Sequence, residues 1–217
     1  MYHNFIHGFI ITASVFCVSV VFGTFAGLVI AAASISNFAY GRMFAKAFVA
    51  TIRGVPELLI ILLAYFGGTA AISAIFGRYV EVNAFASGVG ALTFVFAGYA
   101  AEAFRGALNA IPKGQIEASH SLGLSRWQSW LFVIVPQMIP LAIPAYTNLC
   151  VSLIKDTALV SIVGLSDVMR IAFVGAGSQH APLPFYLMAA GIYLACTSVA
   201  LFGFRQLDRK YRLVRHS

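Results

Sequence analysis

The 217-residue chain is 60% hydrophobic and only 10% charged, and its mean hydropathy is +0.89. These values lie far outside the norms of soluble domains and indicate a membrane protein. The net charge of +7 would suggest a nucleic-acid partner in a soluble protein. Here most Lys and Arg residues flank apolar runs instead, so no nucleic acid is expected.

Five uncharged runs are long enough to cross the hydrocarbon of a bilayer, which takes about 20 residues. They cover residues 9–33, 58–76, 84–101, 130–154 and 185–204. Residues 157–177 are not counted as a sixth span because Asp167 and Arg170 interrupt them; either a re-entrant segment or a surface helix fits. The sequence therefore predicts an all-α polytopic membrane protein, with five transmembrane helices within residues 9–207 and a basic tail at 208–217.

The distribution of basic residues predicts the orientation of these spans. Eleven of the 14 Lys and Arg residues lie in the first loop, in the third loop and in the tail, which share one side of the membrane. Because cytoplasmic segments carry the excess of Lys and Arg, we expect a periplasmic N-terminus and a cytoplasmic C-terminus. The first run lacks a basic flank and is too long for a signal peptide, so we expect a retained helix.

The connection at residues 112–129 is polar and carries helix signals. Pro112 suits a first helical turn, and Gly123 suits a left-handed helix stop. Ser125 followed by Gln128 resembles a capping box. The loop is therefore predicted to form a short helix, a glycine turn and a second helix that continues into the fourth run.

Ala118 and Leu122 lie four residues apart, which gives the short helix a small apolar ridge. Glu117 beside that ridge can hydrogen-bond across an interface. Such a helix either docks a partner or rests on the lipid headgroups as an ordinary amphipathic loop helix.

One motif favours the docking interpretation. Glu117-Ala118-Ser119 is followed after three residues by Gly123, and after nine more by Val133-Ile134-Val135-Pro136. This string resembles the EAA loop of ABC-importer permeases, with Ser in place of the third Ala and Val in place of the pattern's Ile and Leu. Residues 53–59, 97–108 and 155–168 resemble further segments of the polar amino acid permeases, most similar to the histidine and opine uptake permeases of Gram-negative bacteria.

The resemblance implies a type I ABC-importer transmembrane domain in the bacterial inner membrane. In that family the EAA loop is a coupling helix seated in a cytoplasmic ATPase dimer, which assigns ATPase coupling to Glu117, Ala118, Ser119, Leu122 and Gly123. The resemblance also implies a periplasmic amino acid-binding protein. Five spans cannot readily enclose a pathway, so we also expect a second permease subunit, homologous or identical. The expected cargo is a polar amino acid, basic or an opine-like derivative.

The chain is not expected to be an enzyme or to bind a cofactor itself. It has no G-x-x-x-x-G-K-[ST] phosphate loop, so ATP-Mg would be used by the partner subunit. It has no H-E-x-x-H or G-x-S-x-G motif, and its three cysteines show no metal-ligand spacing, so no metal site is predicted. The alternative function, an ion-gradient-driven secondary transporter or channel, would require paired inverted repeats and mid-span carboxylates, and neither is visible.

The polar residues of the outer half are candidates for the pathway or for substrate contact. They are Asp156, Thr157, Ser161 and Asp167. Asp156 beside Lys155 and Asp167 near Arg170 could equally be self-paired structural ions.

Three charged residues are predicted to gate or anchor helix ends. Glu57 opens the second run on its cytoplasmic side, and Glu102 and Arg105 form an i, i+3 pair at the cytoplasmic end of the third. Prolines recur every four residues along one face of the fourth run, at 136, 140 and 144. We expect that run to be bent, either lining a cavity or simply packed with kinks.

Overall fold

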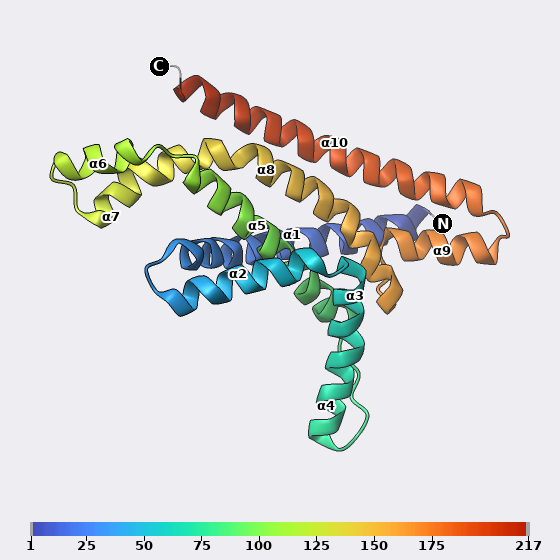
Figure 1. Ribbon diagram of the computed structural model, residues 1–217. Helices are drawn as coiled ribbons and strands as arrows, with labels where there is room; N and C mark the ends of the chain where they lie inside the picture. Colours follow the sequence, from blue (N-terminus) through green and yellow to red (C-terminus); the bar gives the residue numbers. More distant parts are fainter. Residues whose placement is uncertain (1, 216–217) are drawn as a thin grey trace.

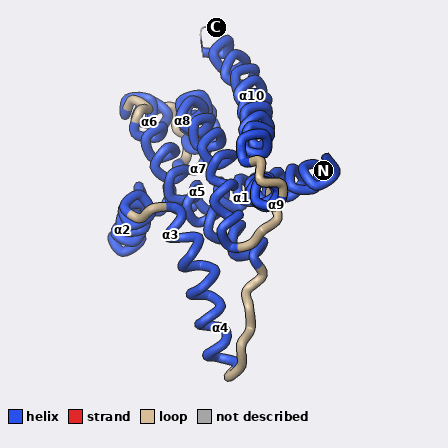
Figure 2. The backbone as a smooth tube through the Cα atoms, turned by 90° about the vertical axis from the view of Figure 1, so that its right-hand side faces the viewer, coloured by secondary structure: helices blue, strands red, loops and turns tan. Residues whose placement is uncertain are grey.

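The computed structural model describes residues 2–215, with side chains for residues 3–211, and every regular element among them is a helix (Figure 1, Figure 2). The elements are α1 (Tyr2–Ile35), α2 (Ala39–Gly54), α3 (Glu57–Leu62), α4 (Gly68–Phe76), α5 (Ala84–Asn109), α6 (Lys113–Ser121), α7 (Arg126–Ser129), α8 (Val135–Asp156), α9 (Val168–Ser178) and α10 (Pro182–Arg215). Two π-helical turns, Leu63–Gly67 and Trp130–Ile134, join α3 to α4 and α7 to α8. A 3-10 helix, Thr157–Val163, continues α8.

Five helical stretches are long and apolar enough to cross a membrane, which confirms the predicted number and order of spans. They are His3–Ile35, Glu57–Phe76, Ala84–Asn109, Arg126–Val163 and Pro182–Tyr211. Four of the five extend well beyond the uncharged runs, because a helix does not end where charged residues begin. The third span, for example, continues through Glu102 and Arg105, which pair with each other.

The centre of the molecule is the seam between α1 and α5. Glycines of α1 allow the two backbones to approach closely: a Cβ added at Gly27 would lie 2.8 Å from the Cβ of Ala100 and 3.2 Å from the carbonyl oxygen of Ala97. Gly98 on another face of α5 admits Ile52 of α2 in the same way. Small residues at a helix interface are how membrane helices gain van der Waals contact without a hydrophobic driving force.

The first predicted loop is itself a helix, α2, which is drawn alongside α1 in Figure 1. The chain is extended at Val55, and Pro56 precedes α3, so α3 and α4 leave the bundle in a new direction. Gly77 then reverses the chain with a positive φ of 65°. Residues 77–83 run back along α4, where the Val80 and Val82 amides donate to the hydroxyls of Ser73 and Thr69. We call residues 57–83 the projecting arm.

Residues 157–177 do not form a sixth span. The 3-10 helix ends at Gly164, which has a φ of 87°, and α9 then packs as a short surface helix against α1 and α10. The fit is close, since the Cδ1 of Ile171 would lie 2.5 Å from a Cβ at Gly8.

The predicted basic tail continues the last helix. Helix α10 runs through residue 204 to Arg215, so residues 208–215 are helical, while residues 216–217 lie outside the described part of the chain. The side chains of Arg212 and Arg215 are likewise outside it.

Candidate functional site

The coupling loop, residues 112–129, folds as the sequence signals predict. Helix α6 ends in a Schellman motif: Gly123 has a φ of 80°, its amide donates to the carbonyl of His120, and the Leu124 amide donates to the carbonyl of Ser119. The capping box is formed as well, since the Gln128 amide donates to Ser125 Oγ and the Ser125 amide donates to Gln128 Oε1. Pro112 differs by one position, because it is the N-cap and the helix begins at Lys113.

The predicted coupling residues divide into an exposed and a buried set. Glu117, Ala118 and Gly123 are exposed, and the side chain of Leu122 is 82% exposed. Ser119 instead points inward, where its hydroxyl lies 2.8 Å from Ser129 Oγ and ties α6 to α7. A partner can therefore reach the ridge, but not the side chain of Ser119.

The sequence analysis did not single out Trp127. It stands in α7, four residues after Gly123, and its side chain is 73% exposed. A large exposed aromatic residue in the same polar loop as an exposed leucine is typical of interface anchors. The capping box of Ser125 and Gln128 could have identified Trp127. It places Trp127 as the second residue of the new helix, in a turn whose position the cap fixes.

Glu57 opens the second span as predicted, because it is the first residue of α3. Helix α2 leads into it, and Tyr99 of α5 donates a hydrogen bond of 3.0 Å to its carboxylate. Tyr99 is ten residues before the end of α5, about 15 Å along the axis. Asp156, the last residue of α8, is close enough for its charge to interact with both groups. We call Glu57, Tyr99 and Asp156 the acidic cluster.

Two of the predicted pathway residues are buried inside the subunit. Thr157 is fully buried and its hydroxyl donates to the carbonyl of Ile154. Asp167 is also fully buried; it caps α9 by accepting from the Arg170 amide and from Tyr193 Oη. Burial raises the pKa of the Asp167 carboxyl to about 6, although these hydrogen bonds oppose the shift.

These positions favour the structural alternative for two of the four predicted pathway residues. Asp167 and Thr157 make their contacts within the subunit, and the guanidinium of Arg170 lies over the Phe173 ring instead of pairing with Asp167. Ser161 and Asp156 are partly exposed.

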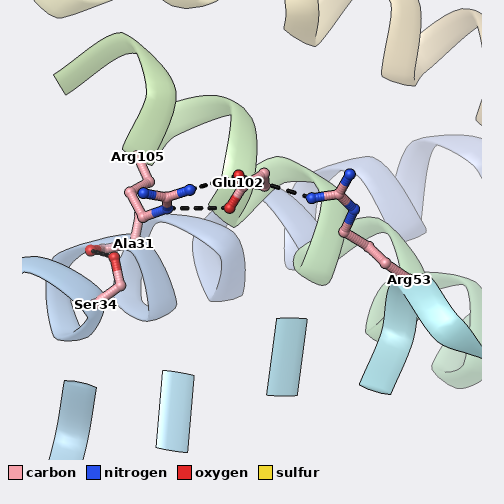
Figure 3. A network of polar contacts seen from close by, with 5 residues as sticks. All are labelled: Ala31, Ser34, Arg53, Glu102 and Arg105. Carbon is pink, nitrogen blue, oxygen red and sulfur yellow. Dashed lines mark hydrogen bonds and ion pairs between the residues drawn. The ribbon is translucent and has the colours of Figure 1, made fainter. Parts of the chain in front are cut away.

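The i, i+3 pair at the end of the third span is formed, and a second arginine joins it. Arg105 donates two hydrogen bonds to Glu102, of 2.6 and 3.0 Å, and Arg53 of α2 lies 3.7 Å from the same carboxylate. Figure 3 shows the two guanidinium groups on opposite sides of Glu102. The sequence analysis missed Arg53 because α2 had been taken as loop.

The proline face of the fourth span points away from the subunit's own core. Pro136 and Pro144 are exposed and Pro140 is half-buried, whereas Met138 and Ala142 on another face are buried. A π-helical turn, Trp130–Ile134, ends two residues before Pro136 and interrupts the regular helix there. Nothing in the described residues groups three or more His, Cys, Asp or Glu side chains as a metal site.

Comparisons with known proteins cover nearly the whole chain. Residues 19–213 match the family model described as "Binding-protein-dependent transport system inner membrane component". The chain is 39% identical over 193 residues to the arginine ABC transporter permease protein ArtQ of Haemophilus influenzae, covering 89% of this chain and 86% of the relative. It is 38% identical over 208 residues to the nopaline transport system permease protein NocQ of Agrobacterium fabrum, covering 93% and 88%.

A solved structure agrees with these matches. The crystal structure of an amino acid ABC transporter with histidines superimposes with a TM-score of 0.86 at 31% identity, covering 96% of this chain and 94% of the solved one. The matched range includes the coupling loop, α2 and the acidic cluster.

Proposed function

The chain belongs to the family of binding-protein-dependent transport system inner membrane components, and from this premise we propose that it carries basic amino acids, or amino acid derivatives such as opines, as the transmembrane subunit of an ATP-driven importer. It is a multi-pass permease of the bacterial inner membrane. The proposal on its cargo has support from the names of the relatives, one of which is an arginine permease and another a nopaline permease.

The acidic cluster is the observation that carries the cargo proposal. Asp156 has no ion pair with any described side chain, and Glu57 accepts only the Tyr99 hydrogen bond. Two carboxylates in a low-dielectric bundle attract a cation far more strongly than they would in water. A guanidinium or ammonium group would compensate them, and Tyr99 Oη would orient the carboxylate of Glu57.

The coupling loop would link the permease to ATP hydrolysis. The exposed ridge of α6 and Trp127 would seat in a cytoplasmic ATPase dimer, which supplies the ATP-Mg chemistry that this chain lacks. The Ser119–Ser129 hydrogen bond joins α6 to the helix that becomes the fourth span. Displacement of α6 would therefore move α8, and with it Asp156.

The orientation follows from the same assignment: the coupling loop and the basic residues of α2 face the cytoplasm, and the N-terminus faces the periplasm. A second permease subunit, identical or homologous, would cover surfaces that this chain leaves open. The most apolar stretch of the third span is 61% buried within this subunit. The corresponding stretches of the second and fifth spans are only 11% and 6% buried, so their surfaces are open to a partner. A periplasmic amino acid-binding protein would deliver the cargo at the α9 end.

The experiment is uptake into proteoliposomes that contain the whole transporter, with its ATPase and binding protein. We expect ATP-dependent uptake of radiolabelled arginine, and we expect Asp156→Asn to lower it at least tenfold while α6-dependent ATPase association stays intact. Lys155→Gln, on the exposed neighbouring residue, is the matched control and should change uptake less than twofold. Uptake that continues without ATP on an ion gradient would overturn the importer assignment, and full uptake in Asp156→Asn would overturn the cargo assignment alone.

A further inference from the structure

A polar cavity that contains none of the residues of the acidic cluster lies between three helices. It has a volume of about 670 Å³ and is bounded by α1, α2 and α5. Its charged lining consists of Lys46 and Arg53 from α2 and of Glu102 and Arg105 from α5, beside Ser34 of α1. Figure 3 shows Arg53, Glu102, Arg105 and Ser34 of this lining. We call this cavity the basic pocket.

The charges of the basic pocket do not cancel. Three cationic side chains face one carboxylate, so the formal balance is +2. Arg105 holds both oxygens of Glu102, and Arg53 lies 3.7 Å from one of them. Lys46 has no hydrogen bond or ion pair with any described side chain. The side chains of both arginines stay accessible, at 54% exposure for Arg53 and 37% for Arg105.

The pocket lies at the end of two spans. Ser34 precedes the last residue of α1, and Glu102 is seven residues, about 10 Å, before the end of α5. Helix α2 carries Arg42, Lys46 and Arg53 within 40° of each other around its axis, because these positions are four and seven residues apart. Phe44 and Phe48 stack on its other face. A helix with one basic and one aromatic face is typical of the membrane interface.

We propose that the basic pocket binds the phosphate of an anionic membrane phospholipid, held by Lys46, Arg53 and Arg105. An excess of positive charge repels a cationic cargo, so the pocket is separate from the cargo route. The apolar walls, which include Ile30 and Val49, suit the glycerol and first acyl carbons next to the headgroup and offer nothing to a free phosphate ion. The lipid assignment rests on the charge and position of the pocket; only its separation from the cargo route rests on the proposed function.

The test measures lipid retention by the purified full-length chain in a neutral detergent. Phosphatidylglycerol and phosphatidylcholine with the same acyl chains are added at equal concentration, and the retained molecules are counted by native mass spectrometry. We expect one preferentially retained phosphatidylglycerol. The double variant Lys46→Gln/Arg53→Gln should weaken its retention about 25-fold, since each basic residue near an anionic lipid contributes about fivefold.

Two further variants separate the site from a folding defect and from diffuse surface charge. Arg42→Gln removes one positive charge from the same face of α2, outside the pocket, and should change retention less than twofold. Glu102→Gln removes the opposing carboxylate and should strengthen retention about fivefold, an increase that misfolding cannot produce. Equal retention of the two lipids, an effect of Arg42→Gln as large as that of the double variant, or displacement of the lipid by millimolar inorganic phosphate would each overturn the proposal.

Discussion

The α1–α5 seam and the coupling loop are held together by different physics. In the seam, glycines bring helix backbones into van der Waals contact, and almost no side-chain hydrogen bonds cross it. The loop buries few side chains and is shaped by a Schellman motif, a capping box and the Ser119–Ser129 hydrogen bond. The comparison teaches that the seam tolerates no added volume, whereas the loop tolerates volume but not the loss of its backbone geometry.

The largest expected effect is a change of volume in the seam. Gly27→Leu would place a side chain against the Ala100 Cβ and the Ala97 carbonyl, which cannot move without separating the helices. We expect a loss of about 3 kcal/mol or more and little folded protein in the membrane. Gly203→Leu, where no atom lies within 4 Å, is the control and should fold normally. Equal thermal stability of the two purified variants would contradict the role of the seam.

The next effect is a change of backbone geometry in the coupling loop. Gly123→Pro removes the amide that donates to His120 and cannot adopt a φ of 80°. We expect normal membrane insertion, because the seam is intact, with ATP-coupled uptake lost. Gly123→Asn can adopt the left-handed conformation and should retain most of the uptake. Wild-type uptake by the proline variant would refute the docking assignment.

Asp167 combines the two kinds of interaction, because it is a helix cap, as in the coupling loop, but is fully buried. Its folded pKa of about 6 is raised above that of an exposed carboxyl, so the folded state binds the proton more tightly. The contribution of Asp167 to stability is therefore greatest below about pH 4 and is lost as the pH rises through 6, by on the order of 2–3 kcal/mol. Asp167→Asn keeps an oxygen for the cap and should abolish this pH dependence. Thermal melts at pH 4 and pH 8 measure the pH dependence of both proteins. An unchanged pH dependence in the variant would show that Asp167 is not its source.

The smallest effect concerns the hydrogen bond within the coupling loop. Ser119→Ala leaves the buried hydroxyl of Ser129 without its partner, and we expect a loss of about 1 kcal/mol. Because Ser119 is turned inward, uptake should fall only a few-fold. The double variant Ser119→Ala/Ser129→Ala should recover part of the loss, and a double-mutant cycle by chemical denaturation measures the coupling. Additive losses would mean that the two hydroxyls do not interact.

The sequence was sufficient for the features set by local rules. The five spans follow from apolar length, and the shape of the coupling loop follows from Gly123 and from Ser125 with Gln128, since turns and caps depend on a few neighbouring residues. The matched family model and relatives confirm the motif-based assignment as an ABC permease.

The sequence was insufficient where the outcome depends on distant parts of the chain. Asp167 and Thr157 look like pathway residues because they are polar and lie near the outer end of a span, but α1 and α10 bury them. Glu57 is the helix start that the sequence predicts, but the residue that donates to its carboxylate, Tyr99, lies 42 positions away. No local pattern reports such a contact.

The length of the fourth span would amplify a small bend near the coupling loop into a larger displacement at its far end. From Arg126 to Val163 it is one helical rod of 38 residues, with its irregular turn and its first proline near the coupling loop. Asp156 is 20 residues beyond Pro136, about 30 Å along the axis. A bend of only about 5° at Pro136 would thus sweep Asp156 through roughly 3 Å, the length of one hydrogen bond.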